Sequence, residues 1–130
     1  MNESRLRQLW IMAILVLVIA IVYTSLSPRP VIPNESFSDK TAHFLAYFSL
    51  ALLGSGIASP ATLWRTMLRC FLLGATMEAA QALLTDHRVA DVADLAANAA
   101  GIVVAWLIVG QGRAGWGLRA AAWLSERRPS

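Results

Sequence analysis

Charged residues are scarce in this chain of 130 residues: they make up 15% of it, whereas apolar residues make up 57%. Soluble globular domains carry about 25% charged residues. No charged residue occurs between Trp10 and Pro28. Several stretches approach the roughly 20 apolar residues that cross a hydrocarbon core of about 30 Å. The composition therefore predicts a helical membrane protein rather than a small soluble domain.

The sequence also lacks the short motifs of several protein classes. Its single cysteine, Cys70, excludes an internal disulfide, and neither a zinc-type cysteine spacing nor a His-Glu-x-x-His motif is found. The net charge of +3 comes from basic residues that are spread over separate segments without an aromatic platform. We therefore expect no nucleic-acid partner.

Apolar stretches separated by helix breakers predict four membrane-spanning helices, over about residues 9–26, 39–57, 63–84 and 90–109. Three prolines between positions 28 and 33, and Pro60, separate the first three, because proline interrupts a helix. A cleaved signal peptide is the alternative for the first stretch. We expect a retained helix, since the stretch fills or exceeds the roughly 7 to 15 residues of a signal-peptide core and Pro28 crowds the cleavage site.

The predicted fold is therefore all-α, a four-helix transmembrane bundle over residues 1–110. A basic amphipathic tail follows over residues 111–130. Its tryptophans and leucines alternate with arginines, which is typical of a short helix lying on an anionic membrane surface. The sequence leaves the oligomeric state open.

The basic residues predict the orientation of this bundle. With four spans, eight of the 11 fall on one side: Arg5, Arg7, Arg65, Arg69, Arg113, Arg119, Arg127 and Arg128. Three fall on the other: Arg29, Lys40 and Arg88. Because positively charged loops remain in the cytoplasm, both termini and the tail are expected there. The segments at 27–40 and 85–90 are expected on the outer side.

Polar side chains concentrate near the outer ends of the last three predicted helices. They are Asp39, Lys40, His43, Tyr47, Glu78, Gln81, Arg88, Asp91, Asp94 and Asn98. Helical spacing places three sets on one face each: Asp39, His43 and Tyr47, then Glu78 and Gln81, then Asp91, Asp94 and Asn98. A charged group at membrane depth costs a few kcal/mol, so a cluster of them is more readily explained by function than by packing. We predict a polar ligand-binding pocket open to the outer side.

The last predicted helix has one half of small residues, which we expect to pack against its neighbours. The opposite half is bulky and is expected to face lipid. Its members are Val92, Leu95, Ile102, Val103, Trp106 and Leu107.

The order and spacing of the polar residues resemble the VanZ-like family of bacterial integral membrane proteins. The motifs that carry the resemblance are Asp39-Lys40-x-x-His43-Phe44-x-x-Tyr47, Glu78-x-x-Gln81, Arg88, Asp91-x-x-Asp94 and Asn98-x-x-Gly101, within residues 37–105. The resemblance implies a four-helix, multi-pass protein of the bacterial cytoplasmic (inner) membrane. It also implies a link to the cell envelope, since the founding member is associated with resistance to the glycopeptide teicoplanin.

Three functions are compatible with these residues. The first is binding of the head group of a membrane lipid or a lipid-linked cell-wall precursor, with Lys40 and Arg88 on phosphate or carboxylate and the acids on ammonium groups. We favour it, and it requires no cofactor and no metal.

The second function is a membrane-embedded hydrolase or transferase acting on a lipid-linked substrate. His43 and Glu78 would be its candidate catalytic base and acid, in one version with a divalent metal on Asp39, Asp91 or Asp94. The third is an ion-coupled transporter, which the apolar inner half of the bundle disfavours. Whether the protein is an enzyme stays open at this point.

Overall fold

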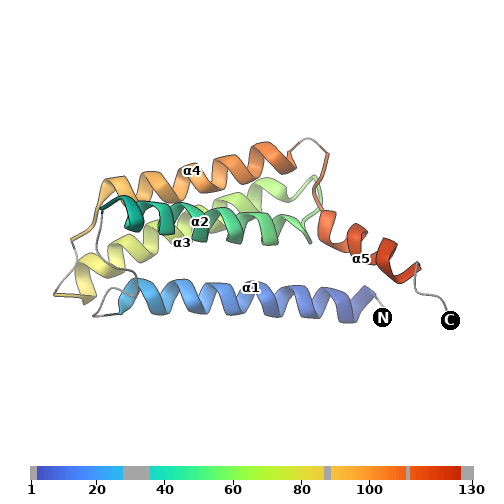
Figure 1. Cartoon of the computed structure of the whole chain (residues 1–130), viewed down its shortest axis with the longest axis horizontal. Coiled ribbons are helices and arrows are strands. Elements are labelled where there is room, and N and C mark those ends of the chain that lie inside the picture. The colour runs from blue at the N-terminus through green and yellow to red at the C-terminus, as the bar shows by residue number, and fades with distance from the viewer. Residues whose placement is uncertain (1–2, 28–35, 87–88, 111, 127–130) are drawn as a thin grey trace.

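The structure is a computed structural model that describes residues 3–27, 36–86, 89–110 and 112–126. Over these residues the chain forms five helices and no strand, as the all-α prediction requires. They are α1 (Glu3–Leu26), α2 (Ser36–Ser55), α3 (Leu63–Leu84), α4 (Val92–Val109) and α5 (Trp116–Glu126). Figure 1 shows α1 to α4 lying alongside one another, with α5 turned away at the end where α1 begins.

Three of the described helices, α1, α3 and α4, are long and apolar enough to cross a membrane. The second helix does not reach this level of hydropathy, because Asp39, Lys40 and His43 occupy its first turns. The expectation of apolar membrane-crossing helices is thus confirmed for three of the four predicted spans.

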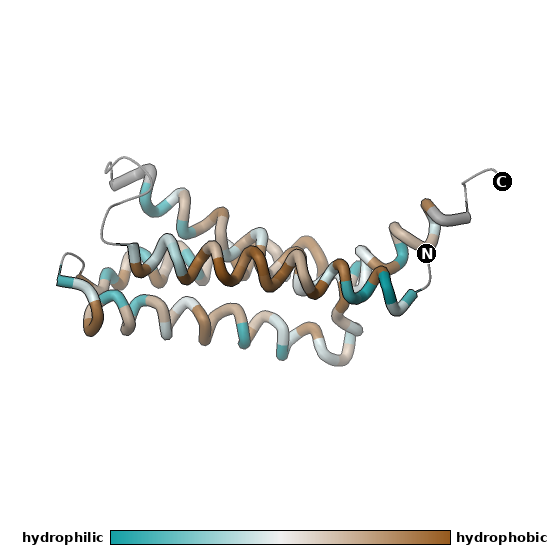
Figure 2. The backbone as a smooth tube through the Cα atoms, turned by 90° about the horizontal axis from the view of Figure 1, so that it is seen from below, coloured by the Kyte–Doolittle hydropathy of each residue, from teal (hydrophilic) through white to brown (hydrophobic). Residues whose placement is uncertain are grey.

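The first helix is apolar around nearly its whole circumference. At about 1.5 Å per residue its 24 residues extend about 36 Å, more than the hydrocarbon thickness of about 30 Å. Figure 2 shows hydrophobic residues along its middle and hydrophilic residues near its N-terminal end. Only Ile21 and Ser25 of this helix are buried. Most of its surface is therefore available to lipid.

The closest helix packing joins α2 and α4. A Cβ at Gly101 would collide with the backbone carbonyl oxygen of Phe44 and lie 2.9 Å from the amide nitrogen of Phe48. Ala51 and Ala105 are fully buried. Small residues let two helix backbones approach closely, which is how membrane helices gain packing energy without a hydrophobic driving force.

The outward half of α4 follows the expected pattern at four of its six positions, and Leu95 is half-buried. Val92, Val103, Trp106 and Leu107 are exposed, as predicted for a lipid-facing surface. The prediction is wrong for Ile102, which is 5% exposed and belongs to the core. At about 100° per residue, Ile102 lies near the line of Asp94 and Asn98, so its position on the helix and not its bulk decides its side.

The last helix is joined to the end of α2. The Gly115 amide donates to the carbonyl of Ser55 over 2.8 Å, and the Gly117 amide donates to Gly56 over 3.1 Å. The ring of Trp116 meets that of Trp10 edge to face, with centroids 5.3 Å apart. These bonds satisfy carbonyl groups that the end of a helix leaves without partners. The beginning of the predicted tail is therefore part of the packed structure, and its contact with a membrane surface stays a prediction.

Candidate functional site

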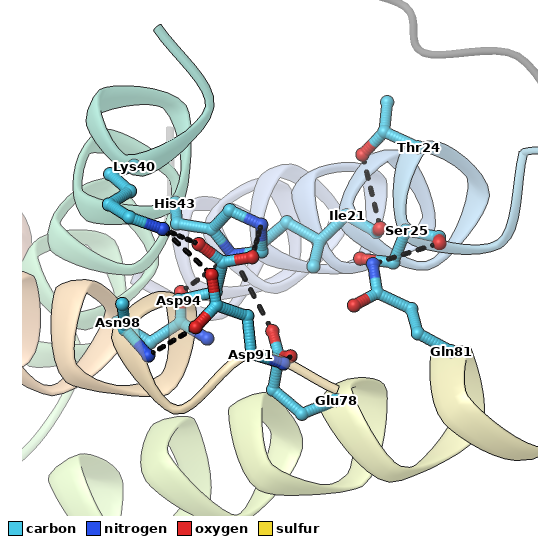
Figure 3. Close-up of polar contacts among 11 residues, drawn as sticks. Ile21, Thr24, Ser25, Lys40, His43, Glu78, Gln81, Asp91, Asp94 and Asn98 are labelled. Carbon is cyan, nitrogen blue, oxygen red and sulfur yellow. Dashed lines mark hydrogen bonds and ion pairs between the residues drawn. The ribbon is translucent and has the colours of Figure 1, made fainter. Parts of the chain in front are cut away.

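Three helix faces direct polar side chains to one end of the structure. In α3 the buried residues Leu63, Met67, Cys70, Gly74, Glu78 and Gln81 form one stripe at spacings of three and four. In α4 the buried stripe begins with Asp94 and Asn98. The stripes are continuous with the apolar core, so packing of their apolar parts carries Glu78, Asp94 and Asn98 inward. Figure 3 shows these groups meeting Lys40 and His43 of α2.

We call the group of Asp39, Lys40, His43, Glu78, Asp91, Asp94 and Asn98 the polar cluster. Lys40 forms its outer layer. Its Nζ lies 2.9 Å from Asp91 Oδ2 and 2.9 Å from Asp94 Oδ1. The side chains of Lys40 and Asp91 are 39% and 48% exposed, whereas that of Asp94 is 10% exposed. One ammonium group thus bridges a solvent-facing carboxylate and a buried one.

Asp91 has a second role as the N-cap of α4. Its side chain accepts a hydrogen bond of 2.8 Å from the amide of Ala93. Such a cap satisfies one of the unpaired amides at a helix start. The hydrogen bond from Lys40, together with the Ala93 amide, holds the pKa of Asp91 below its ordinary value. The start of α4 is therefore tied electrostatically to α2.

His43 lies beneath this layer and contacts both α3 and α4. Its Nδ1 is 3.0 Å from Asn98 Oδ1 and 3.9 Å from Glu78 Oε1, and its Nε2 is 3.7 Å from Asp94 Oδ2. Which atom donates in the contact with Asn98 depends on the tautomer of the ring. When the amide oxygen accepts, Nδ1 carries the hydrogen, and the lone pair of the neutral ring lies on Nε2, the nitrogen that faces Asp94.

Three buried polar atoms at this end have no hydrogen-bond partner among the described residues: Tyr47 Oη, Glu78 Oε1 and Asn98 Nδ2. Tyr47 and Asn98 lie over Gly74, where a Cβ would come within 3.2 Å of each. Buried polar groups are usually satisfied, so each such atom calls for an explanation. All three belong to residues that the sequence predicted for the site.

The VanZ/LLP1 family model matches residues 9–111 of the chain. The chain belongs to the VanZ/LLP1 family. The matched stretch includes every residue of the polar cluster and all of α2, α3 and α4. The resemblance read from the motifs is thereby confirmed. Neither the curated proteins nor the solved structures contain a match to this chain.

One predicted member of the site of this VanZ/LLP1 protein, Gln81, makes its contact away from the cluster. Gln81 Nε2 donates to the backbone carbonyl of Ser25 over 3.0 Å, so its amide ties α3 to the end of α1 (Figure 3). Arg88 lies outside the described residues. Sequence reasoning gave no signal for the Ser25 contact, because a backbone carbonyl carries no residue-specific information.

Three side chains of the cluster could hold a metal ion. One ligand atom each from Asp39, His43 and Asp94 lie within 4.8 Å of one another. Two carboxylates and an imidazole are suitable donors for several divalent metals. Lys40 already contacts Asp94, so a metal would compete with an ammonium group for that carboxylate. The sequence predicted Asp39, Asp91 and Asp94 as candidate metal ligands for the enzyme hypothesis. The structure brings together two of these, Asp39 and Asp94, with His43 as the third donor instead of Asp91.

Proposed function

We propose that this VanZ/LLP1 protein is a four-pass protein of the bacterial cytoplasmic membrane, whose polar cluster binds the head group of an envelope lipid or lipid-linked cell-wall precursor on the outer side. The cluster is defined by Asp39, Lys40, His43, Glu78, Asp91, Asp94 and Asn98. The basic residues support the orientation. Those of α1 and of the start of α3 lie at the end opposite the cluster, and positively charged ends remain in the cytoplasm.

The charge balance of the cluster is the observation that carries the binding proposal. The cluster contains four carboxyl groups, those of Asp39, Glu78, Asp91 and Asp94. Among the described residues it contains one ammonium group, that of Lys40, which pairs with Asp91 and Asp94, while the imidazole of His43 lies near Glu78 and Asp94. Buried carboxylates are costly unless cations compensate them. A ligand that brings an ammonium group would supply such compensation.

The accessible layer of the cluster supports a zwitterionic head group in particular. Lys40 and Asp91 are partly exposed and bonded to each other. A phosphate can replace Asp91 on the Lys40 ammonium, and the freed carboxylate can then accept an ammonium group. Phosphatidylethanolamine carries both groups and is the natural first probe.

Binding would be measured on the full chain in detergent, with phosphatidylethanolamine as the probe and phosphatidylcholine as the comparison lipid. We expect Lys40→Met and Asp94→Asn each to lower affinity at least tenfold, since each removes a charge on which the proposed binding of the head group depends. Asp86→Asn is the matched control, because it removes an exposed acid next to the end of α3. Equal affinities for all three variants and the unaltered chain would contradict the proposal.

Topology is tested separately. Reporter fusions after Ser59 and Ser130 should report the cytoplasm, and a fusion after Asp86 the outer compartment. A reporter after Ser130 that is active outside would place the cluster on the wrong side for an outer-leaflet head group. Since the founding member is associated with teicoplanin resistance, susceptibility to that glycopeptide in cells expressing Asp94→Asn is a further cellular measurement.

A second candidate function is favoured by the donor set of Asp39, His43 and Asp94. With a divalent cation bound there, the site would be a hydrolase or transferase that acts on a lipid-linked substrate, with Glu78 close to the imidazole. Titration of the purified chain with Mn²⁺ or Zn²⁺ tests this candidate. Binding of one metal that His43→Gln and Asp39→Asn abolish and Asp86→Asn retains would support it. Equal binding by all variants would refute it.

A further inference from the structure

A cavity of about 540 Å³ lies at the opposite end from the polar cluster, between α1, α2 and α3. This volume is within the range of about 300 to 1,000 Å³ typical of ligand sites. Its walls are mostly aliphatic and include Ile14, Val18, Leu50 and Leu73. None of the proposed head-group residues lines it. The cavity is therefore a separate feature, and neither the family assignment nor the proposed function accounts for it.

One end of this cavity is basic. Arg7 of α1 and Arg65 and Arg69 of α3 line it, and no carboxylate is among the described residues that do so. All three arginines are exposed, and the guanidinium of Arg65 lies 5.4 Å from the ring centroid of Trp64. Thr62, the N-cap of α3, also lines the cavity and makes no side-chain cap bond, so the positive end of that helix adds to the arginines. This end is electrostatically suited to an anion.

The length of the cavity fits one leaflet of a membrane. Its lining extends from Arg7 to Val18 on α1 and from Thr62 to Leu73 on α3. Eleven residues of helix correspond to about 17 Å, slightly more than half of a hydrocarbon core of about 30 Å. Arg7 and Arg65 lie near one end of this length, Arg69 lies one turn further along α3, and the rest of the lining is mostly aliphatic. An acyl chain below a charged head group has this same distribution of polarity.

We infer that this cavity binds one anionic phospholipid of the cytoplasmic leaflet, with its phosphate at Arg7, Arg65 and Arg69 and an acyl chain between α1 and α3. Charge complementarity favours an anionic over a zwitterionic lipid, because the arginines have no acidic neighbour in the lining to receive an ammonium group. The bound lipid would fill space between α1 and the other helices. It would thereby join α1, which has the fewest buried residues of the four long helices, to the bundle.

Native mass spectrometry of the full chain in detergent, titrated with phosphatidylglycerol and with phosphatidylethanolamine, tests the inference. We expect one phosphatidylglycerol to be retained through Arg65 and Arg69, whereas retention of phosphatidylethanolamine at the polar cluster should not depend on these arginines. The double variant Arg65→Gln with Arg69→Gln should weaken retention about 10- to 30-fold, since each arginine near anionic lipid contributes severalfold. The control, Arg113→Gln with Arg119→Gln, removes the same charge outside the cavity and should change retention less than twofold.

A photoactivatable phosphatidylglycerol, with the reactive group at the end of its acyl chain, locates the site. Crosslinks at Ile14 to Val18 or at Cys70 to Leu73 would support it. Crosslinks spread evenly over the exposed faces of α1 and α4 would overturn it, as would equal weakening by both double variants. Displacement by millimolar inorganic phosphate would assign the arginines to free phosphate. A lipid-free dimer would assign the cavity to a second copy, and either result also overturns the inference.

These results are distinguishable from a failure of the proposed function. Asp94→Asn lies at the other end of the structure and should leave phosphatidylglycerol retention unchanged. Likewise, Arg65→Gln with Arg69→Gln should leave phosphatidylethanolamine binding at the polar cluster unchanged.

Discussion

Substituting Gly101 by alanine should weaken the polar cluster without touching any of its members. The added Cβ would meet the carbonyl oxygen of Phe44 and the amide nitrogen of Phe48, both backbone atoms of α2. A flexible side chain could move aside, but a helix backbone moves only as a unit. To reach ordinary contact distances of 3.4 Å or more, α2 and α4 would have to separate by roughly 1 Å.

That separation fixes the expected magnitude. The bonds between Lys40 and Asp94 and between His43 and Asn98 join the same two helices, at 2.9 Å and 3.0 Å. Lengthening them by about 1 Å takes them beyond hydrogen-bonding distance. Overpacking costs about 1 to 3 kcal/mol and each of the two lost bonds about 1 kcal/mol, so we expect a total of about 3 to 5 kcal/mol. For a chain of this size the melting temperature should fall by roughly 10 to 15 °C.

Thermal unfolding of the purified variant, followed by circular dichroism, is the measurement. The control is Ala100→Leu, which adds more volume on the exposed side of the same helix and should shift the melting temperature by no more than about 2 °C. A Gly101→Ala protein that melts like the unaltered chain would show that the approach of α2 to α4 is not tight, and the account of how the cluster is held would be refuted.

Three further predictions concern the ends of the structure. Lys40→Met leaves the buried Asp94 without its ammonium and should lower the melting temperature in thermal melts. Adding Asp94→Leu should recover most of that loss, whereas no recovery would refute the pairing. Because the pKa of Asp91 is lowered in the folded protein, its carboxylate stabilises the fold above about pH 5, and this stabilisation is lost as the pH falls below about 4. The variant Asp91→Asn should therefore show a smaller decrease of melting temperature on acidification. Gly117→Ala places a Cβ 2.5 Å from the ring of Trp10 and should speed trypsin cleavage in the tail, while an unchanged rate would contradict the docking of α5.

Much of the site could be predicted because helical periodicity carries side chains to known faces. The spacing of Glu78 along α3, and of Asp94 and Asn98 along α4, predicted that they point inward, and they do. Lys40 lies at the same depth on α2 as Asp91 and Asp94 on α4, and it therefore bonds to both. Periodicity fails where two faces meet, as at Ile102, because the boundary of a buried stripe depends on the neighbouring helix.

Other features depend on contacts between distant segments. Trp10 and Trp116 lie at opposite ends of the sequence, and no local pattern links them. The amide of Gln81 contacts a backbone carbonyl of α1, although its place beside Glu78 indicated a role in the cluster. No sequence pattern predicted the cavity between α1 and α3 either. Its walls come from several helices, so it depends on how these helices pack and not on a local motif.

The low hydropathy of α2 is compatible with a membrane-crossing helix once its neighbours are considered. Hydropathy sums all residues of a segment, but a bilayer contacts only those that face outward. Asp94 and Asn98 of α4 receive the polar groups of Lys40 and His43. Leu45 lies on the exposed side, and Phe44 and Phe48 stack with ring centroids 6.0 Å apart. Since polar residues in membrane helices face the bundle interior, the residues that lower the hydropathy of α2 are those that a four-span bundle would place away from lipid.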